Sequence, residues 1–197
     1  MNPNPTQYQV WKRDGYIISM DPSLIPLPQL NDAFASSHMY WAKPVPSEVL
    51  LETLQNSICF GLFATTANNN TSSELNTTNP QPENQDSRKD ETIPAPTSIF
   101  IGLARLITDK TTFAYLTDVY ISPSHQGLGL GTWLVSCVQE VLDGMPYLRR
   151  SVLFTGDWGR SVPFYERIMG MGVVEGRRGE GVAFMERRGP GHPLWKG

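Results

Sequence analysis

The sequence predicts a single domain of the mixed α/β (α+β) class, built on a mostly antiparallel central sheet flanked by helices. Three observations support this fold. An Asp14-Gly15 pair separates two short β-prone runs, two longer β-prone runs flank an Asp109-Lys110 turn, and strand and helix patterns alternate after that turn. The chain of 197 residues can bury one substantial core, so we expect one domain over residues 1–197.

Helix and strand patterns can be assigned along most of the chain. Before residue 66 we expect a hairpin at 8–20, helices at 30–34 and 46–55, and a strand at 58–63. After residue 97 we expect strands at 98–106, 112–121, 150–155 and 182–187, with helices at 129–143 and 161–169. The helix at 129–143 has the clearest buried stripe, which consists of Leu130, Leu134, Val138, Val141 and Leu142.

The stretch from residue 66 to residue 96 differs in composition from the rest of the chain. It consists of Asn, Thr, Ser, Pro, Gln and charged residues, with almost no large apolar side chain. Such a segment cannot bury enough surface to offset its ordering entropy, so we interpret it as a disordered insertion between two adjacent strands. The Gly- and Pro-containing end, residues 189–197, predicts a flexible tail.

Charge and hydropathy argue against several classes of protein. The net charge is -3 and the pI is about 5.6, which disfavours a nucleic-acid-binding protein with its usual basic excess. No stretch reaches the roughly 18 apolar residues of a membrane span, and the polar start of the chain lacks the apolar core of a secretory signal. We therefore expect a cytoplasmic location, with the nucleus as a second one, and neither nucleic acid nor membrane as a partner.

The cysteines and histidines form no metal-binding pattern. Cys59 and Cys137 each lie in an apolar run, which is typical of buried, reduced thiols rather than of a disulfide. His38, His125 and His192 are not spaced as metal ligands. We therefore expect no metal cofactor.

A glycine-rich loop stands between the strand at 112–121 and the helix at 129–143. Gly127, Gly129 and Gly131 occupy alternate positions where the helix begins. Glycine lets backbone N–H groups converge on a ligand, and the helix dipole adds positive potential, so a phosphate or pyrophosphate is the expected guest. The spacing matches neither a P-loop nor a Rossmann fingerprint. On the glycines alone, a flexible turn before the helix is the alternative.

Three segments in this half of the chain carry recognisable motifs. Gln126, Gly129 and Gly131 match the pattern Gln/Arg-x-x-Gly-x-Gly/Ala, and residues 119–123 look like the end of a V-x-V-x-P strand. Residues 164–171 resemble an F-Y-E-K-L-G-F helix, with Gly170 one residue further from Tyr165 than in that pattern. Together they resemble the Gcn5-related N-acetyltransferase (GNAT) family. The resemblance implies a GNAT-like sheet in which two strands splay apart to form an acyl-CoA cleft, with acetyl-CoA as cosubstrate.

The resemblance also implies which residues hold the cofactor. Backbone groups of the strand end would bind the acetyl and pantetheine arm, and those of the loop would bind the pyrophosphate. The residues concerned are Val119, Tyr120, Ile121, Gln126, Gly127, Leu128, Gly129, Leu130, Gly131 and Thr132. Tyr165 is placed near the cofactor sulfur.

Acetyl transfer to an amine also requires proton transfers. An alkyl amine has a pKa of about 10.4, so a base must take its proton at neutral pH. Asp118 and Asp157 are the candidates, each with the alternative of a capping or solvated carboxylate. Tyr165 can protonate the departing thiolate, since a phenol has a pKa of about 10, and packing against Phe164 is its alternative role.

Trp41, Tyr120 and Asp157 are expected to contact the acceptor, although Trp41 is equally well explained as a core aromatic. The sequence thus predicts an N-acetyltransferase that moves an acetyl group from acetyl-CoA to a primary amine by direct attack in a ternary complex. We expect a small-molecule acceptor and a monomer or homodimer. The alternative function is a catalytically weak acyl-CoA-binding or regulatory module of the same fold.

Overall fold

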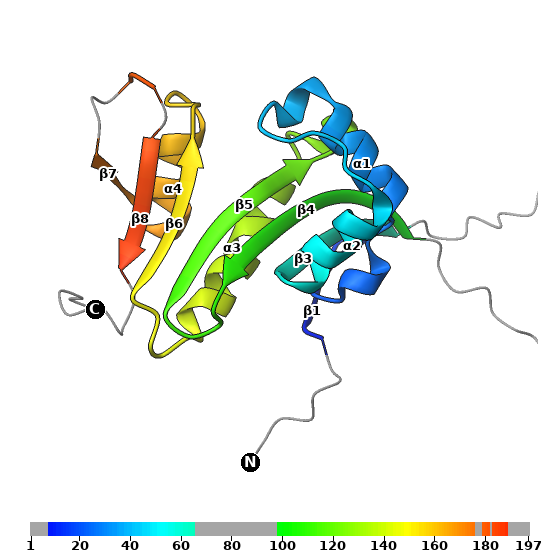
Figure 1. Ribbon diagram of the computed structural model, residues 1–197, viewed down its shortest axis with the longest axis horizontal. Helices are drawn as coiled ribbons and strands as arrows, with labels where there is room; N and C mark the ends of the chain where they lie inside the picture. Colours follow the sequence, from blue (N-terminus) through cyan, green and yellow to red (C-terminus); the bar gives the residue numbers. More distant parts are fainter. Residues whose placement is uncertain (1–7, 66–97, 176–178, 182, 189–197) are drawn as a thin grey trace, which may run out of the picture.

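The computed structural model describes residues 8–65, 98–175, 179–181 and 183–188 (Figure 1). In these residues the strands form one sheet in the order β1-β2-β3-β4-β5-β6-β8-β7. The strands are β1 (Val10–Arg13), β2 (Tyr16–Ser19), β3 (Ile58–Thr65), β4 (Ser98–Thr108), β5 (Phe113–Ile121), β6 (Arg150–Thr155), β7 (Gly172–Glu175) and β8 (Ala183–Arg188). Neighbouring strands run antiparallel except β5 and β6, which run parallel. The mostly antiparallel sheet expected from the sequence is confirmed.

Helices cover both faces of this sheet. α1 (Leu27–Ala35) and α2 (Ser47–Gln55) lie on one face, whereas α3 (Leu130–Asp143) and α4 (Ser161–Met169) lie on the other (Figure 1). Short 3-10 helices, η1 (Pro22–Leu24), η2 (Ser37–Met39) and η3 (Pro123–His125), lie in the connections. The helix–sheet–helix layering accounts for the mixed α/β composition that the sequence predicts.

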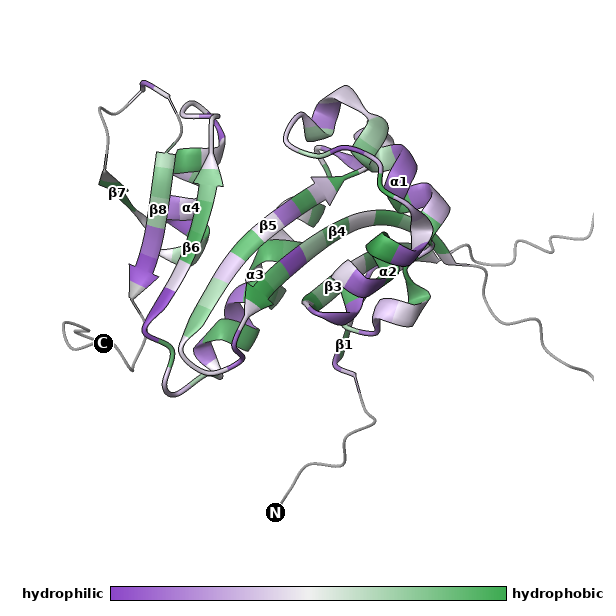
Figure 2. Cartoon of the chain, viewed as in Figure 1, coloured by the Kyte–Doolittle hydropathy of each residue, from purple (hydrophilic) through white to green (hydrophobic). Residues whose placement is uncertain are grey.

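The sheet separates two hydrophobic cores, and β3 contributes to both because successive side chains of a strand point to opposite faces. Phe60 and Leu62 pack on the α3 side, whereas Cys59 and Phe63 pack under α1 and α2. Figure 2 shows stretches of hydrophobic residues along the central strands β4, β5 and β6. Cys59 and Cys137 are buried free thiols, as the sequence predicts.

Most local predictions are confirmed. Asp14 (φ 43°) and Gly15 (φ 81°) form the turn of the first hairpin, and the bounds of β6 and α4 are those expected. The sequence prediction omits β7, because this short strand begins at a glycine and has no clear periodicity of its own; pairing with β8 holds it in the sheet. The predicted insertion at 66–96 and the predicted tail at 189–197 lie outside the described residues.

Two further expectations concern membranes and metals. None of the helices within the described ranges is both long enough and apolar enough to span a membrane. In the same part of the chain, no group of three or more His, Cys, Asp or Glu side chains is placed to hold a metal ion.

β5 and β6 pair at one end only. Residues 113–115 pair with residues 150–152, and beyond them β5 pairs only with β4 while β6 pairs only with β8. The two strands therefore diverge toward their carboxyl ends (Figure 1). Within the described chain, this divergence leaves one edge of β5 without a strand neighbour, and the candidate site is built on that edge.

Candidate active site

A cleft of about 420 Å³ opens between the diverging strands. Residues 115–119 of β5 form one wall, and residues 153–157 of β6 and its following turn form the other. Ser161 and Tyr165 of α4 contribute to the lining, as do His38, Tyr40 and Trp41 from the connection between α1 and α2. Of the residues predicted from the sequence, the cleft brings together Trp41, Asp118, Val119, Asp157 and Tyr165.

Asp118 faces this cleft because β5 contains a bulge. The register of β4 and β5 shifts so that Ala104 of β4 lies opposite both Asp118 and Val119. Asp118 has φ 52°, in the left-handed region that Asp tolerates better than most residues. Its carboxylate therefore meets Arg105 and Trp41 on the α1–α2 side of the sheet, whereas Val119 packs in the core with α3.

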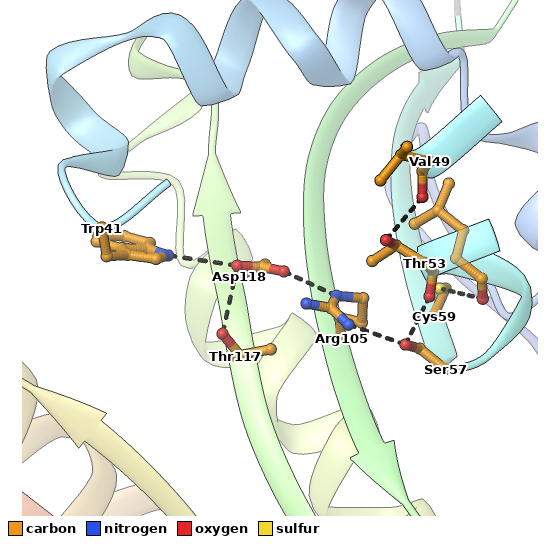
Figure 3. Close-up of polar contacts among 9 residues, drawn as sticks. Trp41, Val49, Thr53, Ser57, Cys59, Arg105, Thr117 and Asp118 are labelled. Atoms are coloured by element: carbon orange, nitrogen blue, oxygen red, sulfur yellow. Dashed lines mark hydrogen bonds and ion pairs between the residues drawn. The ribbon is translucent and has the colours of Figure 1, made fainter. Parts of the chain in front are cut away.

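Both oxygens of Asp118 accept hydrogen bonds (Figure 3). Oδ2 pairs with Nε of Arg105 at 2.7 Å, and Oδ1 accepts from Nε1 of Trp41 and from the hydroxyl of Thr117, each at 3.3 Å. Arg105 also donates to Oγ of Ser57 at 2.9 Å. Because three neighbouring side chains donate to it, the geometry suits this carboxylate to holding its neighbours in place.

Tyr40 and Trp41 tie the connection between α1 and α2 to both diverging strands. Their rings pack edge to face with centroids 5.0 Å apart. Trp41 reaches β5 through its hydrogen bond to Asp118, and the hydroxyl of Tyr40 accepts the N–H of Gly156, just after β6, at 3.3 Å. These two residues therefore form a wall that spans the open end of the cleft.

Tyr165 lies on the buried side of α4, where it is 9% exposed. Its ring packs edge to face with Phe164, which is the packing role considered from the sequence, and it also borders the cleft. Burial raises the pKa of the phenol above its ordinary value of 10.0. The hydroxyl, which is protonated at neutral pH even at the ordinary pKa, can act as a donor in the cleft.

Asp157 combines a capping role with access to the cleft. Its Oδ1 accepts the backbone N–H of Arg160 at 2.9 Å, and its carbonyl oxygen accepts from the N–H groups of Ser161 and Val162 as α4 begins. Its Oδ2 has no hydrogen-bond donor among the described residues, and the side chain borders the cleft. One oxygen is therefore free to meet a ligand.

The glycine-rich loop leads from the carboxyl end of β5 into α3. Gly127 (φ 80°) and Gly129 (φ 74°) adopt left-handed conformations, and a Cβ at either position would meet no described atom within 4 Å. Among the described residues, no side chain caps the first N–H groups of α3. Nε2 of Gln126 donates to the carbonyl of Ile121 at 3.0 Å, which holds the loop against the end of β5.

Other residues predicted for the site lie in different surroundings. Leu128 and Thr132 are exposed, whereas Leu130 is buried in the α3 core. Tyr120 does not line the cleft: it packs on the α1 side and borders a separate hollow of about 320 Å³. The structure thus does not bring Tyr120 together with Trp41 and Asp157.

Sequence reasoning missed Arg105, Tyr115 and Phe154. Arg105 is a charged residue within the apolar run of β4, and a charge in a buried strand needs a partner, which is a usable signal. Tyr115 and Phe154 face each other across the narrow end of the cleft with ring centroids 5.5 Å apart. The sequence identifies them only as β-prone residues, because the contact between their rings depends on where β5 pairs with β6.

Sequence comparisons agree with this geometry. A profile of the acetyltransferase (GNAT) family matches residues 78–171, which include β4, β5, α3, β6 and α4. A Gibberella zeae protein described as an acetyltransferase is 37% identical over 192 residues, which are 96% of this chain and 99% of the relative.

Solved structures share the fold. A GNAT-family protein from Xanthomonas campestris has a TM-score of 0.55 at 23% identity, with 85% of this chain and 97% of that chain covered. A spermidine N-acetyltransferase from Vibrio cholerae, solved with CoA and spermine, has a TM-score of 0.57 at 15% identity, with 88% and 95% covered. The diverging strands and the glycine-rich loop define an acyltransferase. The chain belongs to the GNAT family of acetyltransferases.

Proposed function

We propose that this acetyltransferase moves the acetyl group of acetyl-CoA to the primary amine of a small molecule, by direct attack in a ternary complex. The observation that carries the proposal is the cleft between β5 and β6, which gathers a proton donor and a free carboxylate oxygen beside the unpaired edge of β5. Its volume of about 420 Å³ falls in the range of small-molecule sites.

The residues present fit acetyl-CoA. Gly127 and Gly129 keep the space over the start of α3 free of side chains, so the N–H groups of residues 126–132 could bind the pyrophosphate with help from the helix dipole. The free edge of β5, which includes Val119 and Ile121, would bind the acetyl and pantetheine arm through its backbone. Bound there, acetyl-CoA supplies an activated acyl group and a thiolate that departs.

Tyr165 is the proposed donor of the proton that the thiolate requires. It borders the cleft, and a phenol is protonated at neutral pH, with burial raising its pKa further above the ordinary value of 10.0. General acid catalysis by a positioned side chain typically contributes about 10²–10⁴-fold to a rate.

Asp157 is the proposed acceptor of the amine proton, directly or through water. Its Oδ2 is free of donors from the described chain, whereas both oxygens of Asp118 are already engaged. The sequence offers both Asp118 and Asp157 as candidates for this base, and it predicts that Asp157 also contacts the acceptor. We propose that Asp157 serves both purposes and that Asp118 shapes the cleft.

The experiment has two stages. Calorimetric titration with acetyl-CoA, CoA, NAD and ATP tests the cofactor, and selective micromolar binding of acetyl-CoA and CoA is expected. Release of free CoA thiol is then followed with tyramine, tryptamine, putrescine and spermidine as acceptors, and Tyr165→Phe and Asp157→Asn are compared with the parent enzyme. A folded protein that binds NAD or ATP in preference to acetyl-CoA would refute the cofactor, and turnover that both variants leave unchanged would refute the two roles.

A further inference from the structure

We propose that Arg105 is a positioning residue for the acceptor: it holds Asp118 in its bulged conformation and, through Asp118, fixes the Trp41 indole as a wall of the cleft. The inference rests on the proposed function only in placing the acceptor in this cleft. Arg105 itself does not line the cleft.

The first step is the fixed position of the guanidinium. Nε of Arg105 pairs with Oδ2 of Asp118 at 2.7 Å, and its Nη1 donates to Oγ of Ser57 at 2.9 Å. Ser57 donates in turn to the carbonyl of Thr53 in α2 at 2.8 Å, so the chain of contacts ends in a helix (Figure 3). The two side chains of the ion pair are 13% and 8% exposed. Arg105 is thereby held from both sides, with little freedom to follow its partner elsewhere.

The second step is the dependence of Asp118 on this cation. Asp118 has φ 52°, which is costly for a residue with a Cβ, and its carboxylate is buried. A buried carboxylate without a paired cation is strongly unfavourable. Loss of the guanidinium would therefore drive Asp118 to turn toward solvent, and this change moves the acceptor atom that Trp41 uses.

The third step links Asp118 to the wall of the cleft. Trp41 is 48% exposed, so packing restrains only part of its indole, and its Nε1 donates to Oδ1 of Asp118 at 3.3 Å. Tyr40, its neighbour, is 69% exposed and is bound to the other side of the cleft through Gly156. If Trp41 lost its hydrogen bond to Asp118, the wall formed by Tyr40 and Trp41 would stay attached to Gly156 near β6 and lose its attachment to β5.

The burial of this pair distinguishes it from other ion pairs of the described chain. Arg187 and Asp143 also pair at 2.7 Å, but their side chains are 29% and 51% exposed and they do not border the cleft. A buried pair can often be replaced by apolar residues without loss of stability, so an orienting role is a reason for its presence beside a cleft. Arg187→Gln is therefore a matched control that removes a surface guanidinium.

The test compares Arg105→Gln, Arg105→Lys and Arg187→Gln, each made in the parent enzyme and in a Trp41→Phe background. Kinetics use whichever of tyramine, tryptamine, putrescine and spermidine the parent acetylates fastest. We expect Arg105→Gln to raise the KM for the amine by about tenfold, the size of one lost buried hydrogen bond, with the KM for acetyl-CoA changed less than about twofold. Arg105→Lys should recover part of the loss, and Arg187→Gln should match the parent.

The Trp41→Phe background separates positioning from a general structural defect. The phenyl ring introduced there has no N–H to donate, so Arg105→Gln should raise the KM for the amine little in this background. An equal increase of this KM in both backgrounds would overturn the proposal. Acrylamide quenching of tryptophan fluorescence gives a second measurement that needs no acceptor. The contribution of Trp41 is the fluorescence that the Trp41→Phe substitution removes. Acrylamide should quench this contribution more strongly in Arg105→Gln than in the parent enzyme. Unchanged quenching of that contribution would also overturn the proposal.

Two other outcomes remain interpretable. If Arg105→Gln fails to fold, Arg105→Lys carries the same comparison. A parent enzyme that acetylates none of the amines would count against the proposed function, and quenching would still decide whether Arg105 holds Trp41.

Discussion

Leu116 and Asp118 lie two residues apart on β5 but face opposite sides of the sheet. Leu116 packs in the core with α3, whereas Asp118 contacts Arg105 and Trp41 on the side of α1 and α2. Regular alternation would put both on the same face. The bulge and the left-handed conformation at Asp118 reverse the alternation, so a buried carboxylate enters the cleft wall where an apolar side chain would otherwise follow.

This relationship predicts a graded series of stabilities at Asp118. Asp118→Asn should lower the free energy of unfolding by about 3 kcal/mol, because it leaves the guanidinium of Arg105 buried without a counter-charge. Asp118→Val should cost about 1–2 kcal/mol more, because a β-branched residue is strained at positive φ. Urea denaturation followed by circular dichroism measures both differences.

The control for this series is Asp143→Asn, which breaks the exposed ion pair with Arg187. Exposed pairs contribute about 0–1 kcal/mol, so a small effect is expected there. Equal losses in Asp118→Asn and Asp143→Asn would show that burial of the Arg105 pair has no energetic consequence.

Two substitutions at Gly129 are predicted to separate an effect on phosphate binding from an effect of backbone strain. Gly129→Ala and Gly129→Glu both place a Cβ at φ 74°, so both should lower stability by about 1–2 kcal/mol. Only Gly129→Glu adds a negative charge at the start of α3, so only this variant should also weaken CoA binding strongly, by about tenfold or more, through repulsion of the phosphates. Calorimetry with CoA gives the comparison, and equal affinities in the two folded variants would contradict the loop assignment.

The two cysteines are predicted to be inert in the folded protein. Burial raises the pKa of the Cys59 thiol and of the Cys137 thiol from 9.0 to about 12, so neither is appreciably a thiolate at pH 8. A chromogenic disulfide reagent should titrate neither thiol in the native state and both in denaturant. Rapid reaction of one thiol in the native protein would show that the core around it opens readily.

The raised pKa values of the two thiols also predict that the free energy of unfolding falls as the pH becomes alkaline. The folded thiols bind protons more tightly than the unfolded ones, so their contribution is fully present below pH 9.0 and is lost as the pH rises toward about 12. Cys59→Ala should flatten this decline, and the free energy of unfolding measured between pH 8 and pH 11 checks it.

The sequence predicts those parts of the fold that local signals determine. The turn at Asp14-Gly15, the glycines before α3 and the bounds of α4 all follow from short motifs. The side of the sheet that Asp118 faces does not follow from a short motif, because the bulge depends on how β5 pairs with β4. Arg105 does carry a local signal, a charge within an apolar strand, but its partner on the neighbouring strand could not be identified from the sequence.

Tyr120 and β7 show the same limit in two other ways. The bulge leaves Asp118 and Tyr120 on the same side of the sheet, but Tyr120 lies further along β5, where it packs on the core under α1 and borders a separate hollow instead of the cleft predicted for it. β7 is held by its pairing with β8, and a short segment that begins at Gly172 carries no periodic pattern. In each case the missing information is a contact between strands distant in sequence.

Tyr165→Phe is predicted to reduce turnover while leaving binding and folding intact. The phenyl ring retains the packing against Phe164, so stability and the Kd for acetyl-CoA should stay near the parent values. Loss of the hydroxyl removes the proposed proton donor, and kcat should fall by about 100-fold. Because burial raises the pKa of Tyr165, deprotonation of this phenol should produce no decline of kcat in the parent below about pH 10.

Tyr147→Phe is the matched control for this substitution. Tyr147 is 67% exposed and does not border the cleft, so removal of its hydroxyl should leave kcat unchanged. Stopped turnover assays with saturating acetyl-CoA and amine, together with calorimetry for acetyl-CoA, separate the two variants. A Tyr165→Phe enzyme with parental kcat would mean that solvent protonates the departing thiolate and that Tyr165 only packs against Phe164 and the cleft wall. A fall in kcat accompanied by weaker acetyl-CoA binding would instead place the hydroxyl in ground-state binding of the cofactor, because an interaction made only in the transition state lowers kcat without changing affinity.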